Sequence, residues 1–561
     1  MSAAAVGFAR EALLAGDPQS ALGMLRSQSS GGSEVKYWTA SALMATGETA
    51  EAEAALDAAR TAQTLETIVG MGAEIPRLST DGDYAAQVAT RLYAGQSIAM
   101  SSAVWAIALA AGHQSASGWL TYGLALQHQG RAQAAIDVMR AALERWPSPA
   151  LHQFMLYPHL LLDDGGLGYA AEARRWAQIY APAPTAPRAL ARRPLAGRKL
   201  RIGYVSPSFA RTQIHQFIAP VLEAHDRGAV EVFLYPAKAE GEAIWPEPTT
   251  VRPIGDLTDE AAANLIAADE IDVLVDCWGH SAGSRLSLFA RRCAPVQAGW
   301  INFIQTTGLP QIDYVLHADR QDPEPLEEPF SEAIWPIGPV FNAFRPAAGR
   351  LPPVPTPALS TGQVTFGSFN HPCKLSDPTV AAWAAILKAA PTSRLVLKYG
   401  YFVDPVLRRA TQARFTGHGV APDRIQFRGH SAGEDYFKAF HEIDLALDPW
   451  PSPGSTTTLE ALSNGVPVLS LAGPRRTVGL LYASSILSAA GLAELNAASP
   501  EAYVRAAADL ARDIPALNAL RARVRPGFEA SPLCDGPAFT RRVEAAFAQM
   551  AERAEARAAA A

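Results

Sequence analysis

From residue 199 onward, short apolar runs alternate with segments of helical periodicity, and this alternation restricts the fold more than any other feature. Such runs are typical of strands buried on both faces, and helices between them favour parallel sheets. The first series of runs is 199–206, 230–235, 271–276 and 297–303, with a predicted helix at 259–268. The second series is 364–369, 394–398, 424–427, 443–447 and 466–471. We therefore predict two α/β lobes, separated by the proline-rich stretch 345–357.

The first 180 or so residues are rich in Ala and Leu at helical spacing and contain an internal repeat. The clearest copy, 116–149, has its turn at Gly130. The residues at its characteristic repeat positions are Trp119, Tyr122, Gly123, Leu126, Ala135, Met139, Ala142 and Pro147. Weaker copies occur at Phe8, Ala12, Gly16, Ala21 and Leu25, and at Leu43, Gly47, Ala52, Leu56 and Ala59. This spacing is typical of tetratricopeptide repeats and predicts a solenoid with a concave binding face. Simple helix packing without a partner is the alternative.

These patterns predict four segments in a chain of 561 residues, which is long enough for several domains. We expect a helical domain over 1–180, a linker over 181–198, an N-terminal lobe over 199–345 and a C-terminal lobe over 358–561. The 48 basic and 54 acidic residues nearly balance, with a net charge of -6, and the basic ones are scattered. This balance argues against a nucleic-acid partner.

The cysteines and the apolar segments bear on the compartment. Cys277, Cys293, Cys373 and Cys534 are far apart and form no C-x-x-C pair, so we expect neither a disulfide framework nor a zinc site. The N-terminus lacks the pattern of a secretory signal, and the most apolar stretch, 102–112, is too short to span a bilayer. The sequence therefore predicts a soluble, cytoplasmic protein without a membrane span.

The stretch 447–460 reads as a strand end, a turn rich in Pro and Gly, and a helix start. Gly454 leads into Ser455, Thr456 and Thr457, at the helix end whose backbone N–H groups and dipole attract anions. Glu460, one turn later, could reach a ribose hydroxyl. The implied ligand is a phosphorylated sugar or a nucleotide, although the hydroxyl groups could also merely cap the helix.

Other polar side chains follow predicted strands, where open α/β sheets bind ligands. Lys374 follows Asn370 and His371, and its compact positive charge could bind a phosphate. Alternatively, it is an ordinary surface lysine. In the first lobe, His280 and His215 follow strands and could act as bases, or could be structural histidines. Arg211 is a further candidate beside His215. The loop 306–314 could line the side of a cleft at which the acceptor binds, or it could be an ordinary loop.

In this order the motifs resemble the O-linked N-acetylglucosamine transferase and SPINDLY family, in which tetratricopeptide repeats precede a GT-B glycosyltransferase. The resemblance covers essentially the whole chain and rests on 201–206, 294–300, 306–314, Phe369 and Asn370 with Lys374, 447–467 and 531–535. It implies an all-α tetratricopeptide-type solenoid followed by an α/β GT-B fold of two Rossmann-like lobes.

The resemblance also implies roles for individual residues. Lys374 matches the lysine that holds the donor phosphates, and Asn370 and His371 precede it in the same cluster. Gly454, Ser455, Thr456 and Thr457 match the loop that cradles those phosphates, and Glu460 matches the acid at the ribose. Tyr436 stands where related enzymes have a histidine beside the nucleobase. No metal and no cofactor beyond the nucleotide-sugar donor is expected.

Three departures leave the donor open. Thr212 and Gln213 replace a common His-Pro pair, Tyr436 replaces a histidine, and Ser455 stands where the N-acetylglucosamine enzymes have a histidine. The donor is then uridine-diphosphate N-acetylglucosamine, a guanosine-diphosphate sugar or a cytidine-monophosphate sialic-type sugar. The base is His215, His280 or water.

The predicted function is an inverting protein O-glycosyltransferase that modifies Ser or Thr of a partner recruited by the repeats, with flagellin as a suggested acceptor. The alternatives are a repeat-based adaptor with inactive lobes and a GT-B enzyme that acts on a small sugar or lipid. The prediction requires Lys374 to lie near Thr456.

Overall fold

Two compact units make up the chain. The computed structural model describes residues 17–26, 77–184, 194–210, 214–238, 245–302, 304–319, 329–473 and 477–560, with a few single residues besides. Unit 1 comprises Met1–Ala142, Leu351–Leu447 and Ala508–Leu517, and unit 2 comprises Leu143–Arg350, Asp448–Ala507 and Asn518–Ala561. The predicted domain boundaries stay a prediction.

Some predicted features lie outside the described residues. The weaker repeat at 43–59 is wholly outside them, and of the repeat at 8–25 only Ala12, Ala21 and Leu25 are described. Arg211, Thr212 and Gln213 are also outside. Within the described part of the chain, no helix combines the length and the apolar character that crossing a bilayer requires.

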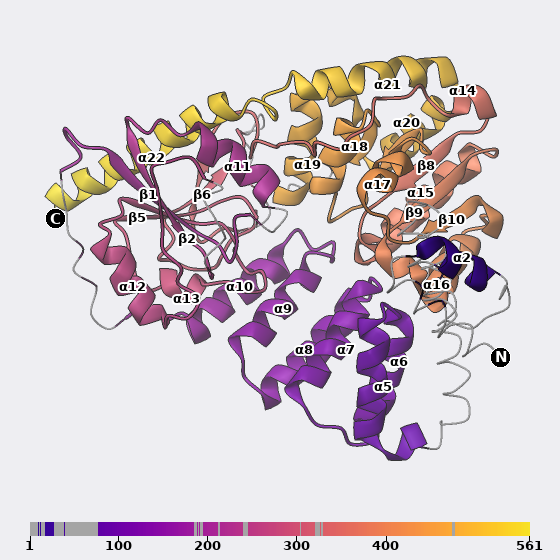
Figure 1. Cartoon of the computed structure of the whole chain (residues 1–561), viewed down its shortest axis with the longest axis horizontal. Helices are drawn as coiled ribbons and strands as arrows, with labels where there is room; N and C mark the ends of the chain where they lie inside the picture. Colours follow the sequence, from indigo (N-terminus) through magenta and orange to yellow (C-terminus); the bar gives the residue numbers. More distant parts are fainter. Residues whose placement is uncertain are drawn as a thin grey trace. The chain divides into compact units, whose positions relative to one another are not determined.

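Before the first sheet, the described part of the chain is helical. Its helices are α2 (Pro18–Arg26), α5 (Gly82–Ala94), α6 (Ile98–Ala110), α7 (Ala116–His128), α8 (Ala132–Arg145), α9 (Pro149–His159) and α10 (Leu167–Tyr180). In unit 1, α5, α6 and α7 pack side by side (Figure 1). Asp81 and Ser115 begin two of these helices by accepting N–H groups of Tyr84 and Gly118, which would otherwise lack a partner. Leu92 and Trp105 lie in the core between α5 and α6.

The clearest predicted repeat is confirmed as a helical hairpin. Helix α7 ends at His128 and α8 begins at Ala132, so the turn falls at Gly130 as expected. The small and apolar positions of its inner face are buried, namely Gly123, Leu126, Ala135, Met139 and Ala142. The hairpin therefore packs through the residues that the repeat pattern marked.

A seven-stranded parallel sheet lies in unit 2, in the order β3-β2-β1-β4-β5-β6-β7. Its strands are β1 (Leu200–Val205), β2 (Val230–Tyr235), β3 (Thr249–Val251), β4 (Val273–Asp276), β5 (Val296–Gly299), β6 (Tyr314–His317) and β7 (Ala333–Pro336). The intervening helices are α11 (His215–Ala224), α12 (Asp259–Ala268) and α13 (Leu286–Phe289). The central strands are buried, because helices cover both faces of such a sheet.

A second parallel sheet in unit 1 has the order β10-β9-β8-β11. Its strands are β8 (Thr365–Ser368), β9 (Arg394–Lys398), β10 (Ile425–Arg428) and β11 (Leu445–Leu447), and its helices are α14 (Ala358–Thr361), α15 (Asp377–Ala389), α16 (Pro405–Gly417) and α17 (Gly433–Phe440). In unit 2, β12 (Val468–Leu471) pairs with β13 (Asn496–Ala497). The last helices are α18 (Thr456–Ser463), α19 (Val478–Ala489), α20 (Pro500–Arg512), α21 (Ile514–Glu529) and α22 (Gly536–Ala560).

The predicted strands are confirmed in position, with differences at the ends. The expected strand 297–303 ends at Gly299, because the chain turns at Ile301, whose φ is +93°. Tyr314, expected in a loop, begins β6. The edge strands β3 and β7 were missed because their partly exposed residues give no apolar run.

Helix α22 returns across unit 2 and packs on α11, β4 and β5 (Figure 1). Phe539 stacks on Trp300, with ring centroids 5.9 Å apart. Glu544 lies 2.7 Å from Nδ1 of His225, whose Nε2 lies 2.9 Å from the Tyr204 hydroxyl. The C-terminal helix is therefore part of the core that contains β1.

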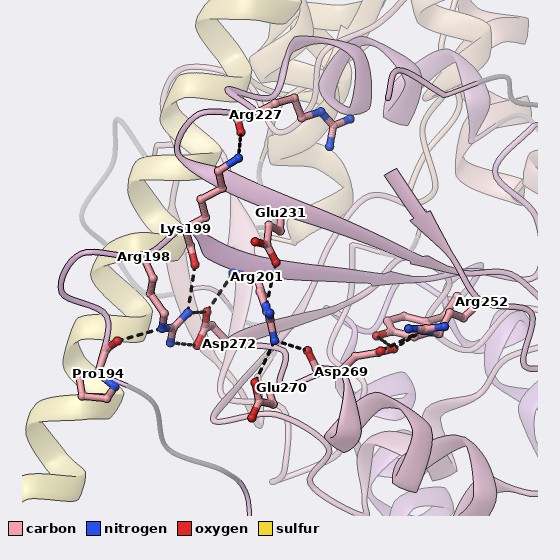
Figure 2. Close-up of polar contacts among 11 residues, drawn as sticks. Pro194, Arg198, Lys199, Arg201, Arg227, Glu231, Arg252, Asp269, Glu270 and Asp272 are labelled. Atoms are coloured by element: carbon pink, nitrogen blue, oxygen red, sulfur yellow. Dashed lines mark hydrogen bonds and ion pairs between the residues drawn. The ribbon is translucent and has the colours of Figure 1, made fainter. Parts of the chain in front are cut away.

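Paired charges fix the start of β1 (Figure 2). The Asp272 carboxylate accepts two hydrogen bonds from the Arg198 guanidinium, at 2.6 and 2.7 Å, and a third from the backbone N–H of Arg201 at 2.9 Å. The Arg201 side chain then bridges Glu231 and Glu270. Asp272 is buried, so the loss of its charge would leave Arg198 without its partner.

We predict that Asp272→Ala destabilises the protein by about 3 kcal/mol, because it breaks a buried ion pair. The apparent melting temperature should fall by about 5–10 °C, as followed by circular dichroism. Asp509→Ala is the control: it removes an exposed pair with Arg512 within one helix and should cost less than about 1 kcal/mol. If the two substitutions lowered the free energy of unfolding equally, the ion pairs would not stabilise the start of β1 as described.

Candidate active site

The predicted phosphate lysine lies on a short turn that directly follows β8. Residues Pro372–Lys374 form the 3-10 turn η1, and Lys374 donates its backbone N–H to the carbonyl of His371 at 3.0 Å. His371 Nδ1 accepts the N–H of Cys373 at 3.0 Å, so the imidazole caps the turn. Asn370 is buried, and its amide donates to the Ser368 hydroxyl at 3.3 Å. The three predicted residues are thus brought together on one turn.

Aromatic rings surround His371. Tyr399 and Tyr401, which follow β9, lie with ring centroids 4.5 and 5.2 Å from it. His128 at the end of α7 lies at 4.9 Å. Burial lowers the pKa of His371 well below its usual value, and the nearby His128 and Lys374 lower it further. His371 is therefore a neutral support for the turn and adds no charge of its own.

Tyr436 lies on α17, after β10, within a second group of rings. Its ring packs edge-on against Phe440, at 5.5 Å, and Phe440 in turn packs against Phe369 at 4.7 Å. The ammonium of the buried Lys398 lies 6.0 Å from the Tyr436 ring centroid and donates to the carbonyl of Gly429 at 2.9 Å. Lys398 ends β9 and was missed from the sequence, because a lysine within a strand carries no distinctive pattern.

In unit 2, the backbone before α18 passes through a space that only glycine fits. A Cβ placed on Gly454 would lie 2.7 Å from both the Asp448 carboxylate and the Thr457 hydroxyl, and closer still to the Thr458 hydroxyl. Ser455 is the N-cap residue and Thr456 begins the helix. The backbone at Gly454 therefore lies tightly against the side chains of Asp448, Thr457 and Thr458, which hold the loop at the start of α18 in place.

Two side chains that sequence reasoning missed brace this loop. Asp448 is buried and accepts the Thr458 hydroxyl at 3.0 Å, while its carbonyl accepts the Tyr503 hydroxyl at 3.0 Å. The Tyr482 hydroxyl lies 3.4 Å from that of Ser455 and accepts a hydrogen bond from Asn342 at 3.1 Å. Asp448 belongs to the stretch 447–460 that the sequence analysis singled out, whereas Tyr482 lies in α19, where no sequence pattern indicated a role.

Glu460 lies one turn into α18 and is half-buried. Its backbone carbonyl accepts the side-chain amide of Asn464 at 2.8 Å. Thr457 and Glu460 lie three and six residues after Gly454, on the first two turns of the same helix. The residues of unit 2 that are predicted to bind ribose and phosphate therefore lie on α18 or directly before it.

His215 begins α11, after β1, and is partly exposed. Its Nδ1 lies 3.2 Å from the carbonyl of Phe209, and its ring lies 5.9 Å from that of Trp245. Because Nδ1 faces a carbonyl, it carries the proton and Nε2 has the lone pair that a base requires. His215 can therefore fill the predicted role of proton acceptor.

His280, the other predicted base, is buried against helix α10. Its Nε2 donates to the carbonyl of Thr307 at 2.8 Å, and its ring packs edge-on against Trp176 at 4.9 Å. Burial lowers its pKa to about 4. This placement favours a packing role, so His215 is the better candidate for the base.

The loop 306–314 is also built into the fold of unit 2. Thr306 and Thr307 are buried, and both donate their hydroxyls to the Glu332 carboxylate. The Tyr169 hydroxyl of α10 donates to the carbonyl of Thr306 at 2.9 Å. This arrangement favours the alternative of an ordinary loop that docks α10.

The predicted donor residues are divided between the units: Asn370, His371, Lys374 and Tyr436 in unit 1, and Gly454, Ser455, Thr456, Thr457 and Glu460 in unit 2. The proximity of Lys374 to Thr456 stays a prediction. Among the described residues, no group of three or more His, Cys, Asp or Glu side chains could hold a metal ion.

Several known proteins are similar to this chain. The probable UDP-N-acetylglucosamine–peptide N-acetylglucosaminyltransferase SPINDLY of Oryza sativa subsp. japonica is 35% identical over 370 residues, which are 64% of this chain and 40% of that protein. The corresponding SEC protein of Arabidopsis thaliana is 28% identical over 368 residues, 63% of this chain and 37% of that protein. The chain thus matches about two fifths of the length of these plant relatives.

A solved structure of a mutant Thermobaculum terrenum O-GlcNAc transferase is similar over 98% of this chain and 97% of its own, with a TM-score of 0.73 and 27% sequence identity. Together with the two parallel sheets, this likeness fits a GT-B α/β fold. The model of the family described as glycosyl transferase family 41 matches residues 128–341 and 356–543, more than half of the 561 residues. The chain therefore belongs to glycosyl transferase family 41.

Proposed function

We propose that this chain transfers a sugar from a nucleotide-sugar donor to Ser or Thr side chains of a partner protein. Its family supports this reaction, and so do the names of its plant relatives, which describe probable UDP-N-acetylglucosamine–peptide N-acetylglucosaminyltransferases. The observation that carries the proposal is the start of α18, where the crowded Gly454 is followed by the hydroxyls of Ser455, Thr456 and Thr457, and where the N-cap Ser455 makes no side-chain capping hydrogen bond. Such an end suits the phosphates of a nucleotide.

In the proposed reaction the acceptor hydroxyl oxygen attacks the anomeric carbon while the bond from that carbon to the phosphate oxygen breaks. The departing nucleotide keeps the electron pair, and the configuration at the carbon inverts. Lys374 and the N–H groups of α18 stabilise the charge that develops on the phosphate, without a metal. The hydroxyl proton passes to Nε2 of His215 or to water.

The donor and the acceptor are the open parts of the proposal. Tyr436 and Ser455 replace histidines that the family resemblance led us to expect, so the nucleotide is uridine-, guanosine- or cytidine-based. The helices of 1–180, which we interpret as a tetratricopeptide-type solenoid, would recruit the acceptor, and flagellin is the acceptor we suggest. We expect the reaction to take place in the cytoplasm.

A panel of nucleotide sugars tests the activity directly. The protein is incubated with UDP-N-acetylglucosamine, a GDP-sugar and a CMP-sialic acid, and nucleotide release and protein labelling are measured. Release with labelling of a protein acceptor supports the proposal. Partner binding without release would instead identify an adaptor with inactive lobes, and labelling of only a small sugar or lipid would identify the other alternative.

We predict that Lys374→Ala lowers nucleotide release at least about hundredfold, because the developing phosphate charge loses its counter-charge. The melting temperature should stay unchanged, since Lys374 is only half-buried. Lys388→Ala, which removes an exposed lysine of the neighbouring helix α15, is the matched control and should retain full activity. Unchanged release in Lys374→Ala would reject the proposed site.

Gly454→Ala should weaken nucleotide binding at least about tenfold, because its methyl group cannot fit between Asp448 and Thr457 without moving the start of α18. Isothermal titration calorimetry measures this change. Gly479→Ala is the control: its Cβ would meet Pro453 at 3.6 Å, an ordinary contact, so binding should persist. Wild-type affinity in Gly454→Ala would show that the nucleotide binds elsewhere.

A further inference from the structure

The turn that carries Lys374 rests on the helical hairpin α7–α8, and both lie in unit 1. Gly130, in the hairpin turn, has a φ of +79°. A Cβ placed on it would lie 3.5 Å from the carbonyl oxygen of Cys373 and 3.6 Å from that of Pro372. The backbones of the two turns are therefore almost in direct contact.

His128, the last residue of α7, fills the space beside this contact. Its ring lies 4.9 Å from both His371 and Tyr401. On its other side, Nε2 lies 3.0 Å from the Tyr93 hydroxyl of α5. The imidazole is thus held by α5 while it supports the ring of His371.

His371 transmits this support to the lysine. Its Nδ1 receives the N–H of Cys373, and its carbonyl receives the N–H of Lys374. A shift of the His371 ring would therefore move the whole turn. Burial lowers the pKa of His128 to about 4, so its neutral ring can pack there without repelling Lys374.

We infer that His128, a residue of the helical region, is a positioning residue for the donor phosphates: through His371 it fixes the turn from which Lys374 reaches the leaving nucleotide. This inference rests on the proposed function. It makes the helical hairpin part of the donor site, in addition to any role in recruiting the acceptor.

Other contacts hold the helices in place when the ring of His128 is removed. The Asp404 carboxylate accepts the N–H of Ala99 at the start of α6 at 2.8 Å, and also caps α16 through Val406. The side chain of Gln96, just before α6, also lies beside Gly400: a Cβ placed on Gly400 would be 3.4 Å from the Gln96 amide oxygen. A variant at His128 should therefore keep the helices attached and change mainly the support of the Lys374 turn.

The test is a double-mutant cycle on the full chain, with the dissociation constants of UDP, GDP and CMP measured by calorimetry and the tightest nucleotide used throughout. His128→Ala should weaken binding about tenfold, and His128→Phe, which keeps a flat ring, should stay within about threefold of wild type. In a Lys374→Ala background, His128→Ala should cause no further loss, because both act through one group. If His128→Ala does not fold, His128→Leu takes its place.

Leu92→Ala is the control for a purely structural effect. It empties part of the α5–α6 core one residue from Tyr93, and should lower the melting temperature while leaving nucleotide affinity unchanged. Wild-type affinity in His128→Ala, or losses that add to that of Lys374→Ala, would overturn the inference alone. If Lys374→Ala itself binds nucleotide and transfers sugar as well as wild type, the proposed function fails first, and the inference fails with it.

Discussion

Parallel strand direction is the constraint on which the candidate site depends. In a parallel sheet every strand ends at the same edge, so the loops that follow neighbouring strands emerge together. In unit 1 this places the Lys374 turn after β8, the tyrosine pair after β9 and α17 after β10 on one edge. In unit 2 it does the same for His215 after β1 and His280 after β4. Sheet direction, rather than closeness in sequence, brings the polar residues of each unit to one edge.

Uncharged rings lie around His371 at this edge of the sheet in unit 1. His128 and His371 are kept uncharged by burial, which lowers the pKa of each imidazole. Tyr399 is kept protonated, because burial raises its pKa to about 12. The rings packed on His371 therefore bring no charge to the turn, and the positive charge on the turn itself comes from Lys374. An uncharged ring lining of this kind strengthens the attraction of an ammonium group for a phosphate, because it screens the charges less than water does.

Much of the fold could be predicted from the sequence, because buried strands and repeat positions leave periodic apolar patterns. Most core strands, helix α12 and the hairpin turn at Gly130 followed from such patterns, whereas the short buried strand β6 was missed. The edge strands β3 and β7 did not, since a partly exposed strand has no apolar run. Residue types at strand ends made Lys374 and Gly454 candidates for the site. Long-range packing did not show in the sequence: nothing there indicated that His280 would be buried by α10, or that Tyr482 would reach Ser455.

The crowding around Gly454 has a consequence for how members of such a fold can differ. The space between Asp448 and Thr457 admits a hydrogen atom and no methyl group, so this point of the backbone tolerates no chemical variation. Tyr436, by contrast, is only partly buried. In the proposed site Gly454 belongs to the loop that would hold the phosphates, whereas Tyr436, on another helix, would meet the nucleobase. A chain built in this way can change its preferred nucleotide by altering Tyr436 while it keeps the same anchor for the leaving group.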